Sequence, residues 1–216
     1  MGGIAAEGQG DSAIIRATAE NIAIPDLEHS LQVARLSLQL HDQLRDTLHL
    51  SPESRDLLAA AALWHDVGQF RNLPEHHKQS FEIIVAQLLK GYSRLEQLQI
   101  ANIARYHRRA HPSREHPGYR NLPRRLRPDV DRMSALLRIA EGLDAGHLGV
   151  VRDLQCEIHP GYITVRVRAQ SYPMLEIERA QERAGLFREV FNRDIEFAAS
   201  VERGDAQAND RRHERE

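Results

Sequence analysis

The feature that most restricts the fold of this sequence is an apolar run that ends in an adjacent histidine and aspartate. The run extends from Leu57 to Val67, and His65 and Asp66 stand side by side near its end. An apolar helix normally excludes ionisable groups, because a buried charge is costly unless it is paired or bound to a metal. Two interpretations follow: a capping aspartate beside a core histidine, or a metal site at the C-terminal end of the helix.

Most of the chain around this run is predicted to be helical. Asp26 is a predicted N-cap for a helix through about His41, and the next helix is predicted to begin at Ser51-Pro52 and to end at Gly68. Prolines between Ala110 and Pro128 predict a loop or broken helix there. The remaining helices are expected at about 77–90, 94–109, 129–145 and 174–199.

Two segments rich in β-branched residues, Val150–His159 and Tyr162–Ala169, flank Pro160-Gly161 and predict a short β-hairpin. The expected fold class is therefore mainly α, a helical bundle with a small β-hairpin and a C-terminal helix. The expected organisation is a disordered N-terminus (1–19), a helical metal-binding domain (20–148), the hairpin with the final helix packed on it (149–199) and a disordered tail (200–216).

Composition narrows the function. The one cysteine, Cys156, excludes an intrachain disulfide and a zinc site built on several thiolates. No apolar run approaches the length of a membrane span and no secretory signal is visible, so a cytoplasmic protein with no membrane partner is expected. The net charge of −2 and the scarcity of aromatics, at 5%, argue against a nucleic-acid partner.

Further imidazoles and carboxylates occur at the edges of the other predicted helices. Glu141 and Asp144 are three residues apart, which places both on one face of an apolar helix. Nitrogen and oxygen ligands from separate helices are how helical bundles build di-metal sites. The histidines that stand with them are His29, His77 and His107.

Five strings resemble, in order, the C-terminal HD-like domain of the exopolyphosphatase and guanosine pentaphosphate phosphohydrolase family, within the HD-domain superfamily of metal-dependent phosphohydrolases: HSLQVARLSLQLHDQL, LLAAAALWHDVGQF, HHKQSFEII, IARYHRR and LLRIAEGLD. The resemblance covers about residues 20–199. The actin-like domains that precede this domain in the family, and their glycine-rich phosphate loops, are not in this sequence, so a stand-alone domain is expected.

The resemblance implies a divalent metal centre of one or two ions, drawn from Mn, Fe, Co, Ni, Zn and Mg. Mixed imidazole and carboxylate ligands suit the transition metals in this set, and they suit Mg less readily. The superfamily's last ligand is usually the aspartate of an Ala-Asp pair, where this chain has Ala140-Glu141, so Glu141 and Asp144 both stay open as the last ligand. Asp66 would bridge two ions. The implied ligands are His29, His65, Asp66, His77, His107 and Glu141, with His76 and Asp144 in reserve.

The function expected on this basis is metal-dependent hydrolysis of a phosphate ester or anhydride by a metal-bound hydroxide, with His65 and Asp66 as the catalytic pair. Candidate substrates are nucleotides, alarmones, cyclic nucleotides and short polyphosphate. Lys78, Arg108 and Arg109 are the expected substrate-binding residues, in or near a stretch that carries eight arginines between Arg105 and Arg127.

Two other functions remain open from the sequence. One is a non-catalytic module that binds polyphosphate or an alarmone, or that regulates a separate actin-like subunit. The other is an HD-fold oxygenase with a di-iron centre. The resemblance also implies a homodimer, because related domains associate through their helices.

Overall fold

The computed structural model describes residues 23–70, 74–87, 89 and 91–201. Over these residues the chain forms a helical bundle and one small sheet, which confirms the predicted mainly α fold. The elements, in chain order, are α2 (Leu27–Leu48), α3 (Pro52–Trp64), the 3-10 helix η1 (Val67–Phe70), α4 (His76–Ala86), α5 (Arg94–Arg105), α6 (Pro117–Arg120), the 3-10 helix η2 (Arg124–Leu126), α7 (Arg127–Gly142), β1 (Val151–Ile158), β2 (Tyr162–Ala169), α8 (Met174–Arg183), α9 (Gly185–Phe191) and β3 (Asp194–Val201).

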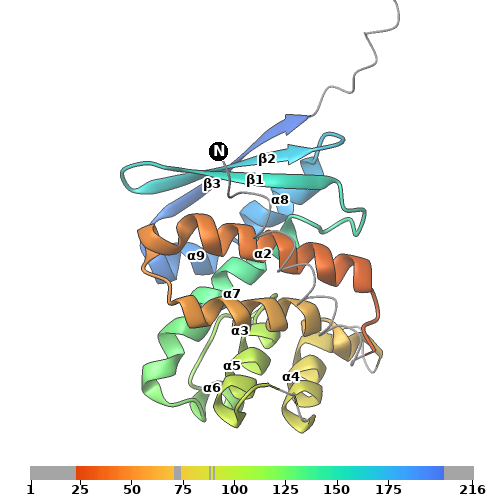
Figure 1. The fold of residues 1–216 in the computed structure, drawn as a ribbon, viewed down its shortest axis with the longest axis vertical. Coiled ribbons are helices and arrows are strands. Elements are labelled where there is room, and N and C mark those ends of the chain that lie inside the picture. The colour runs from red at the N-terminus through yellow and green to blue at the C-terminus, as the bar shows by residue number, and fades with distance from the viewer. Residues whose placement is uncertain (1–22, 71–73, 88, 90, 202–216) are drawn as a thin grey trace, which may run out of the picture.

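The elements are stacked in layers (Figure 1). The sheet lies at one end of the molecule and α2 runs beneath it, with α8 close to the sheet. The helices α3 and α7 follow, and α4, α5 and α6 lie farthest from the sheet. Helix α7 is the central element: nearly all of its residues from Met133 to Gly142 are buried. Within the described residues, no helix has the length and apolar character needed to cross a bilayer.

Local sequence signals explain where several helices begin. The Asp26 side chain accepts a hydrogen bond from the backbone N–H of His29, and Ser51 accepts one from Ser54. Ser93 and Glu96 form a capping box at the start of α5. These caps satisfy backbone donors that a helix leaves unpaired in its first turn. The cap at Asp26 also places His29 in the first turn of α2.

The sheet has the strand order β1-β2-β3. Strands β1 and β2 form the predicted antiparallel hairpin, with Ile158 opposite Ile163. Strand β3 returns to pair with β2 in parallel, in a register that sets Tyr162 opposite Asp194. Glutamine side chains of α2 form hydrogen bonds with the backbone of the edge strand β1: for example, Gln43 donates to the Leu154 carbonyl at 2.8 Å. The sheet is therefore attached directly to the helix that carries His29.

The predicted single helix over 174–199 is wrong. Helix α9 ends because Asn192 takes a left-handed conformation, with φ of 50°, as its C-cap. From there the residues alternate: Asp194 and Glu196 are exposed, whereas Ile195 is buried. This period of two is typical of a strand rather than a helix. The C-terminal segment therefore consists of α8, α9 and β3, and the predicted hairpin belongs to a three-stranded sheet.

Several predicted helix ends also need correction. The first helix extends to Leu48 rather than His41, and α3 ends at Trp64, so Gly68 lies in η1 instead of closing that helix. Helix α5 ends at Arg105, and His107 follows it in a turn. The predicted disordered N-terminus lies outside the described residues, as do residues 202–216 of the tail, whereas Ser200 belongs to β3.

Candidate metal centre

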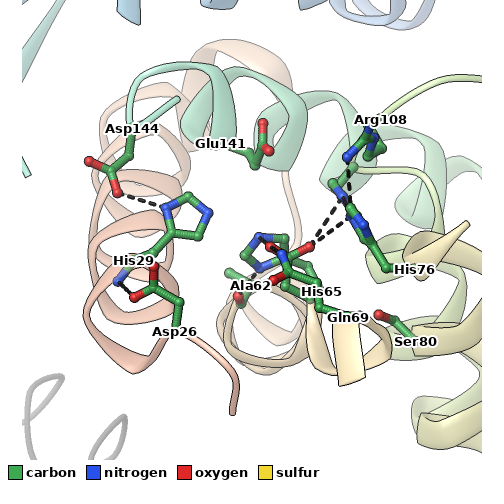
Figure 2. A network of polar contacts seen from close by, with 12 residues as sticks. Asp26, His29, Ala62, His65, Gln69, His76, Ser80, Arg108, Glu141 and Asp144 are labelled. Carbon is green, nitrogen blue, oxygen red and sulfur yellow. Dashed lines mark hydrogen bonds and ion pairs between the residues drawn. The ribbon is translucent and has the colours of Figure 1, made fainter. Parts of the chain in front are cut away.

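Four histidines and one aspartate converge from separate parts of the bundle (Figure 2). One group consists of His29, His65 and Asp66, and a second consists of Asp66, His76 and His107. Within each group the ligand-type atoms lie within 4.8 Å of one another, and every member is buried. Asp66 belongs to both groups, so it stands where a bridging carboxylate would stand.

The distances around Asp66 are short. Its Oδ1 lies 3.0 Å from Nε2 of His76 and 3.6 Å from Nε2 of His107. Its Oδ2 lies 3.5 Å from Nε2 of His65. The Nε2 atoms of His76 and His107 are 3.2 Å apart, and the two rings are stacked. Asp66, His76 and His107 therefore bring three potential electron-pair donors together in one buried place.

All five residues lie at or near helix ends. His29 lies in the first turn of α2, His65 and Asp66 follow α3, and His76 begins α4. His107 stands two residues after the end of α5. Helix α4 approaches the His65–Asp66 turn closely because Gly68 has no side chain: a Cβ there would lie 2.2 Å from the carbonyl oxygen of His76. The backbone N–H of Gly68 also donates to Ser80 of α4 at 3.0 Å. The glycine after the His-Asp pair thus permits the contact that brings His76 to Asp66.

The outward-facing nitrogen of three of the histidines is already committed. Nδ1 of His29 donates to the Asp144 carboxylate at 2.7 Å. Nδ1 of His65 donates to the carbonyl of Ala62 at 2.6 Å, and Nδ1 of His107 donates to that of Ala104 at 2.7 Å. A carbonyl or carboxylate acceptor keeps the proton on Nδ1, which leaves the Nε2 lone pair of a neutral ring for another partner.

Electrostatics favour neutral rings at His65 and His107 and an ionised Asp66. Burial lowers the pKa of His65 and lowers that of His107 well below its usual value, although Asp66 opposes both shifts. Burial raises the pKa of Asp66, but the proximity of His65, the hydrogen bond from His76 and the proximity of His107 outweigh it, so this pKa lies below its usual range. Neutral imidazoles beside a carboxylate are the protonation states that a divalent cation binds.

The arrangement fits a metal ion. Nε2 of His29 and Nε2 of His65 are buried and have no hydrogen-bond partner among the described residues, and buried polar atoms are rarely left in that state. Ligand atoms lie about 2.0–2.2 Å from a transition-metal cation, so two ligands of one cation stand about 3–3.5 Å apart. The separations around Asp66 fall close to that range. Buried histidine and aspartate groups that could bind a metal are thus present.

Neither of the two carboxylates that the sequence left open belongs to these groups. Asp144 accepts from His29 through one oxygen and from the backbone N–H of Gly149 through the other, at 3.0 Å. The Glu141 carboxylate is paired with Arg183 of α8. Figure 2 shows Glu141 on α7, between His29 and Arg108. In this structure Asp144 contacts a candidate ligand instead of sharing the groups, and Glu141 contacts an arginine.

The structure places His76 rather than His77 in the second group. His77 is buried beside the site, and in the part of the chain that the structure describes its Nδ1 has no hydrogen-bond partner. Burial lowers its pKa to about 4, and the nearby positive groups, His76 and Arg108 first among them, add to that effect. The sequence did not separate these adjacent histidines, because the angle at which α4 begins decides which ring turns inward.

The predicted substrate residues lie at the rim of the centre. Arg108 is half-buried, and its Nη1 lies 3.3 Å from Nε2 of His76. Arg109, which is exposed, has a left-handed backbone with φ of 58°. Lys78 points to Glu75 on the same helix and is about half exposed. Arg108 is therefore the predicted arginine that reaches the histidine cluster.

Sequence reasoning missed four contributors. Gln69 donates through its side-chain amide to Oδ2 of Asp66. His147 stacks on His29, with ring centroids 3.7 Å apart. Arg138 of α7 donates to the carbonyls of Tyr106 and Arg109, which flank His107 and Arg108, and Arg183 of α8 is paired with Glu141. Gln69 stands three residues after Asp66, a local spacing that could have been noticed, whereas the other three depend on packing between distant segments.

The sequence matches a known family model. A family model described as Ppx/GppA phosphatase, domain III, covers residues 13–159, which is more than half of the chain. The matched segment contains both groups of candidate ligands and Asp144, and it ends just after β1. Helices α8 and α9 and strands β2 and β3 lie beyond it.

Proposed function

Because the chain belongs to the family of Ppx/GppA phosphatases, domain III, we propose that it is an HD-type, metal-dependent phosphohydrolase. The family is related to polyphosphate and nucleotide phosphatases, so a phosphate-containing substrate is the starting point. The proposed reaction is hydrolysis of a phosphate ester or anhydride. The candidate substrates are nucleotides, alarmones, cyclic nucleotides and short polyphosphate.

One observation carries the proposal: the two groups share Asp66, and three of the four histidines have Nδ1 bonded away from the centre. A histidine that is merely packed in a core needs partners for both ring nitrogens. Here Nε2 of His29 and Nε2 of His65 find no such partner within the described ranges. Outward bonds that fix the tautomer of an inward nitrogen are typical of metal-binding histidines.

The residues take the following roles. His29 and His65 would hold one ion, His76 and His107 would hold a second, and Asp66 would contact both. Bound divalent cations would polarise the phosphoryl oxygens and lower the pKa of a coordinated water. Gln69 fixes the Asp66 carboxylate by donating to Oδ2. Because every member of the groups is buried, the site limits the bulk water that competes for the cations.

The substrate side is positively charged. Arg108 stands next to His76 and can direct a guanidinium toward a phosphate bound at the centre. Burial lowers the pKa of Arg108 below its ordinary value, and the charge of Arg109 adds to this effect while that of Asp66 opposes it. Arg109 and Lys78, at the rim, can attract an anionic substrate before it binds.

The test combines metal content with phosphate release. The purified protein is analysed for bound transition metals, and phosphate release is followed from a panel of nucleotides, alarmones, cyclic nucleotides and polyphosphate with added Mn²⁺. The double variant His65→Ala/Asp66→Ala is expected to lose both bound metal and activity. The matched control is His159→Ala/Asp46→Ala, which changes the same residue types at a partly exposed and an exposed position and keeps both.

Three results would contradict the proposal. A folded wild-type protein that binds no metal and releases no phosphate, yet binds polyphosphate or an alarmone in the presence of a chelator, would instead be a binding module. Iron content with oxygen consumption would identify an oxygenase. Phosphate release that survives in the double variant would place the chemistry elsewhere in the chain.

A further inference from the structure

Helix α8 brings an arginine to the candidate centre from outside the segment that the family model matches. Arg183 is the last residue of α8, and its guanidinium is paired with the Glu141 carboxylate on α7. Both side chains are shielded from solvent, with exposed fractions of 21% for Arg183 and 9% for Glu141. Such a shielded pair is much less screened than an ion pair on the surface.

A close helix crossing sets this pair in place. A Cβ on Gly142 would lie 2.7 Å from the backbone Cα and N of Ala180, so α7 and α8 touch backbone to backbone at this point. Glu141 immediately precedes the crossing residue on α7. Arg183 lies three residues beyond Ala180 on α8, which puts it on the same helix face. The crossing thus directs Arg183 at Glu141.

Arg183 lies in a concentration of positive charge. Burial lowers its pKa to about 10, and repulsion from Arg108 and Arg138 contributes, while the charge of Asp66 opposes the shift. Arg138 has a structural task, since it donates to the carbonyl oxygens of Tyr106 and Arg109. Arg183 has no backbone carbonyl partner among the described residues, and its side-chain partner is Glu141.

We propose that Arg183 is a substrate-binding residue that exchanges its ion pair with Glu141 for a phosphate group bound at the histidine centre. This inference rests on the proposed function, because it takes the bound molecule to be a phosphate compound. A guanidinium fork matches a phosphate as well as it matches a carboxylate. A phosphate held by Arg108 from one side can therefore compete with Glu141 for Arg183.

The exchange has a second consequence. When a phosphate takes Arg183, the Glu141 carboxylate loses its partner and is left near the candidate ligands. Glu141 is one of the two residues that the sequence left open as the last metal ligand. The same carboxylate would then have two alternative partners, Arg183 in the free protein and a cation in the complex.

The first test measures anion binding without metal or turnover. Inorganic pyrophosphate is titrated into the full chain in the presence of a chelator, and heat is recorded. Arg183→Gln is expected to raise the dissociation constant for pyrophosphate by roughly tenfold to a hundredfold, the range for a hydrogen bond between charged groups. Arg179→Gln, on the same helix but exposed and paired with Glu182, is the matched control and stays within about twofold of wild type.

The second test uses the sign of an effect. Glu141→Gln removes the competitor of the phosphate, so pyrophosphate binding is expected to strengthen severalfold under the same conditions. Arg183→Lys keeps the charge but not the fork, and an intermediate loss of affinity is expected from it. Far-UV circular dichroism checks the fold of each variant. If Arg183→Gln does not fold, the lysine and Glu141 variants still decide the question.

Failure of this inference can be told apart from failure of the proposed function. Pyrophosphate binding that depends on Arg183 in a protein without phosphatase activity would keep the anion site and reject the enzyme. An active enzyme in which Arg183→Gln leaves both KM and pyrophosphate affinity unchanged would reject the role of Arg183. No pyrophosphate binding at millimolar concentration, or weaker binding by Glu141→Gln, would also overturn it.

Discussion

Asp144 accepts a hydrogen bond from Nδ1 of His29 at 2.7 Å, across 115 residues of sequence. Both side chains are almost fully buried, and the second Asp144 oxygen accepts from Gly149. The bond joins the first turn of α2 to the segment after α7 and turns Nε2 of His29 toward the centre. Asp144 therefore acts as a positioning residue for a candidate ligand.

Asp144→Asn is predicted to lower metal affinity by about tenfold to a hundredfold, the usual effect of removing a partner from a metal-binding histidine. The amide retains the size of the side chain but not its charge. Metal affinity is measured by competition with a coloured chelator. Asp129→Asn, near the surface at the start of α7, serves as the control and should bind metal as the wild type does.

A double-variant cycle distinguishes this role from direct ligation. If Asp144 acts through His29, the effects of Asp144→Asn and His29→Ala on metal affinity are expected to be strongly non-additive, with the double variant close to His29→Ala alone. Additive losses would show instead that Asp144 contacts the metal independently.

Arg138 is predicted to hold the turn that carries His107 and Arg108. Its Nη1 donates to the carbonyl of Tyr106 at 3.0 Å, and its Nη2 donates to that of Arg109 at 3.1 Å. Arg138→Met leaves both carbonyls without this partner, so the free energy of unfolding should fall by about 2–4 kcal/mol. Urea denaturation provides the measurement. Arg132→Met, on the same helix but partly exposed, should change it by less than about 0.5 kcal/mol.

Gly68→Ala is predicted to separate α4 from the His65–Asp66 turn. The new Cβ would lie 2.2 Å from the His76 carbonyl oxygen, so backbone has to move, with a loss of about 1–3 kcal/mol of unfolding free energy. Gly185→Ala is the matched control, since its Cβ would meet nothing closer than a His111 ring atom at 3.6 Å. Thermal unfolding and metal stoichiometry are compared. A stable Gly68→Ala protein with full metal content would refute the prediction.

Acid is predicted to destabilise the protein that is free of metal. Burial lowers the pKa of His77 to about 4 and lowers those of His65 and His107. Unfolded histidine titrates near 6.5, so between about pH 4 and 6.5 the unfolded chain binds more protons than the folded one. The free energy of unfolding therefore keeps its full value above pH 6.5. It decreases as the pH falls below that, by at most about 1.4 kcal/mol per pH unit for each histidine.

The measurement is urea unfolding in chelator at pH 7.5, 6 and 5. His77→Gln removes one of these histidines, so its stability should decrease less between pH 7.5 and 5 than that of the wild type. The control is His159→Gln, a partly exposed histidine beside the hairpin turn and away from the centre, and it should follow the wild-type curve. A stability that stays constant or increases toward pH 5 would contradict the assigned direction.

The sequence predicted the helical elements and the hairpin well because their signals are local. Asp26, Ser51 and Pro52 are capping residues whose effect lies within one helical turn. Strand β3 was missed because Asp194–Val201 gains its partner from β2, more than twenty residues earlier. An alternating segment after a helical pattern is ambiguous until its pairing strand is known.

In the candidate site, too, local features were predictable and those that depend on packing were not. The side chains of His29, His65, Asp66 and His107 meet as the sequence suggested, since each occurs at a helix end facing one centre. His76 was ranked below His77, because the two are adjacent and the rotation of α4 separates them. The pairing of Glu141 with Arg183 depends on the α7–α8 crossing at Gly142, which no local pattern announces.

The parallel pairing of β2 with β3 has a consequence for synthesis. The ribosome makes the chain from its N-terminus, so His29 to Asp144 are all available before the first strand begins at Val151. The sheet cannot gain its third strand until α8 and α9, which connect β2 to β3, have been made. Arg183 belongs to this connection. The histidine cluster can therefore assemble early in biogenesis, and the arginine that faces it arrives late.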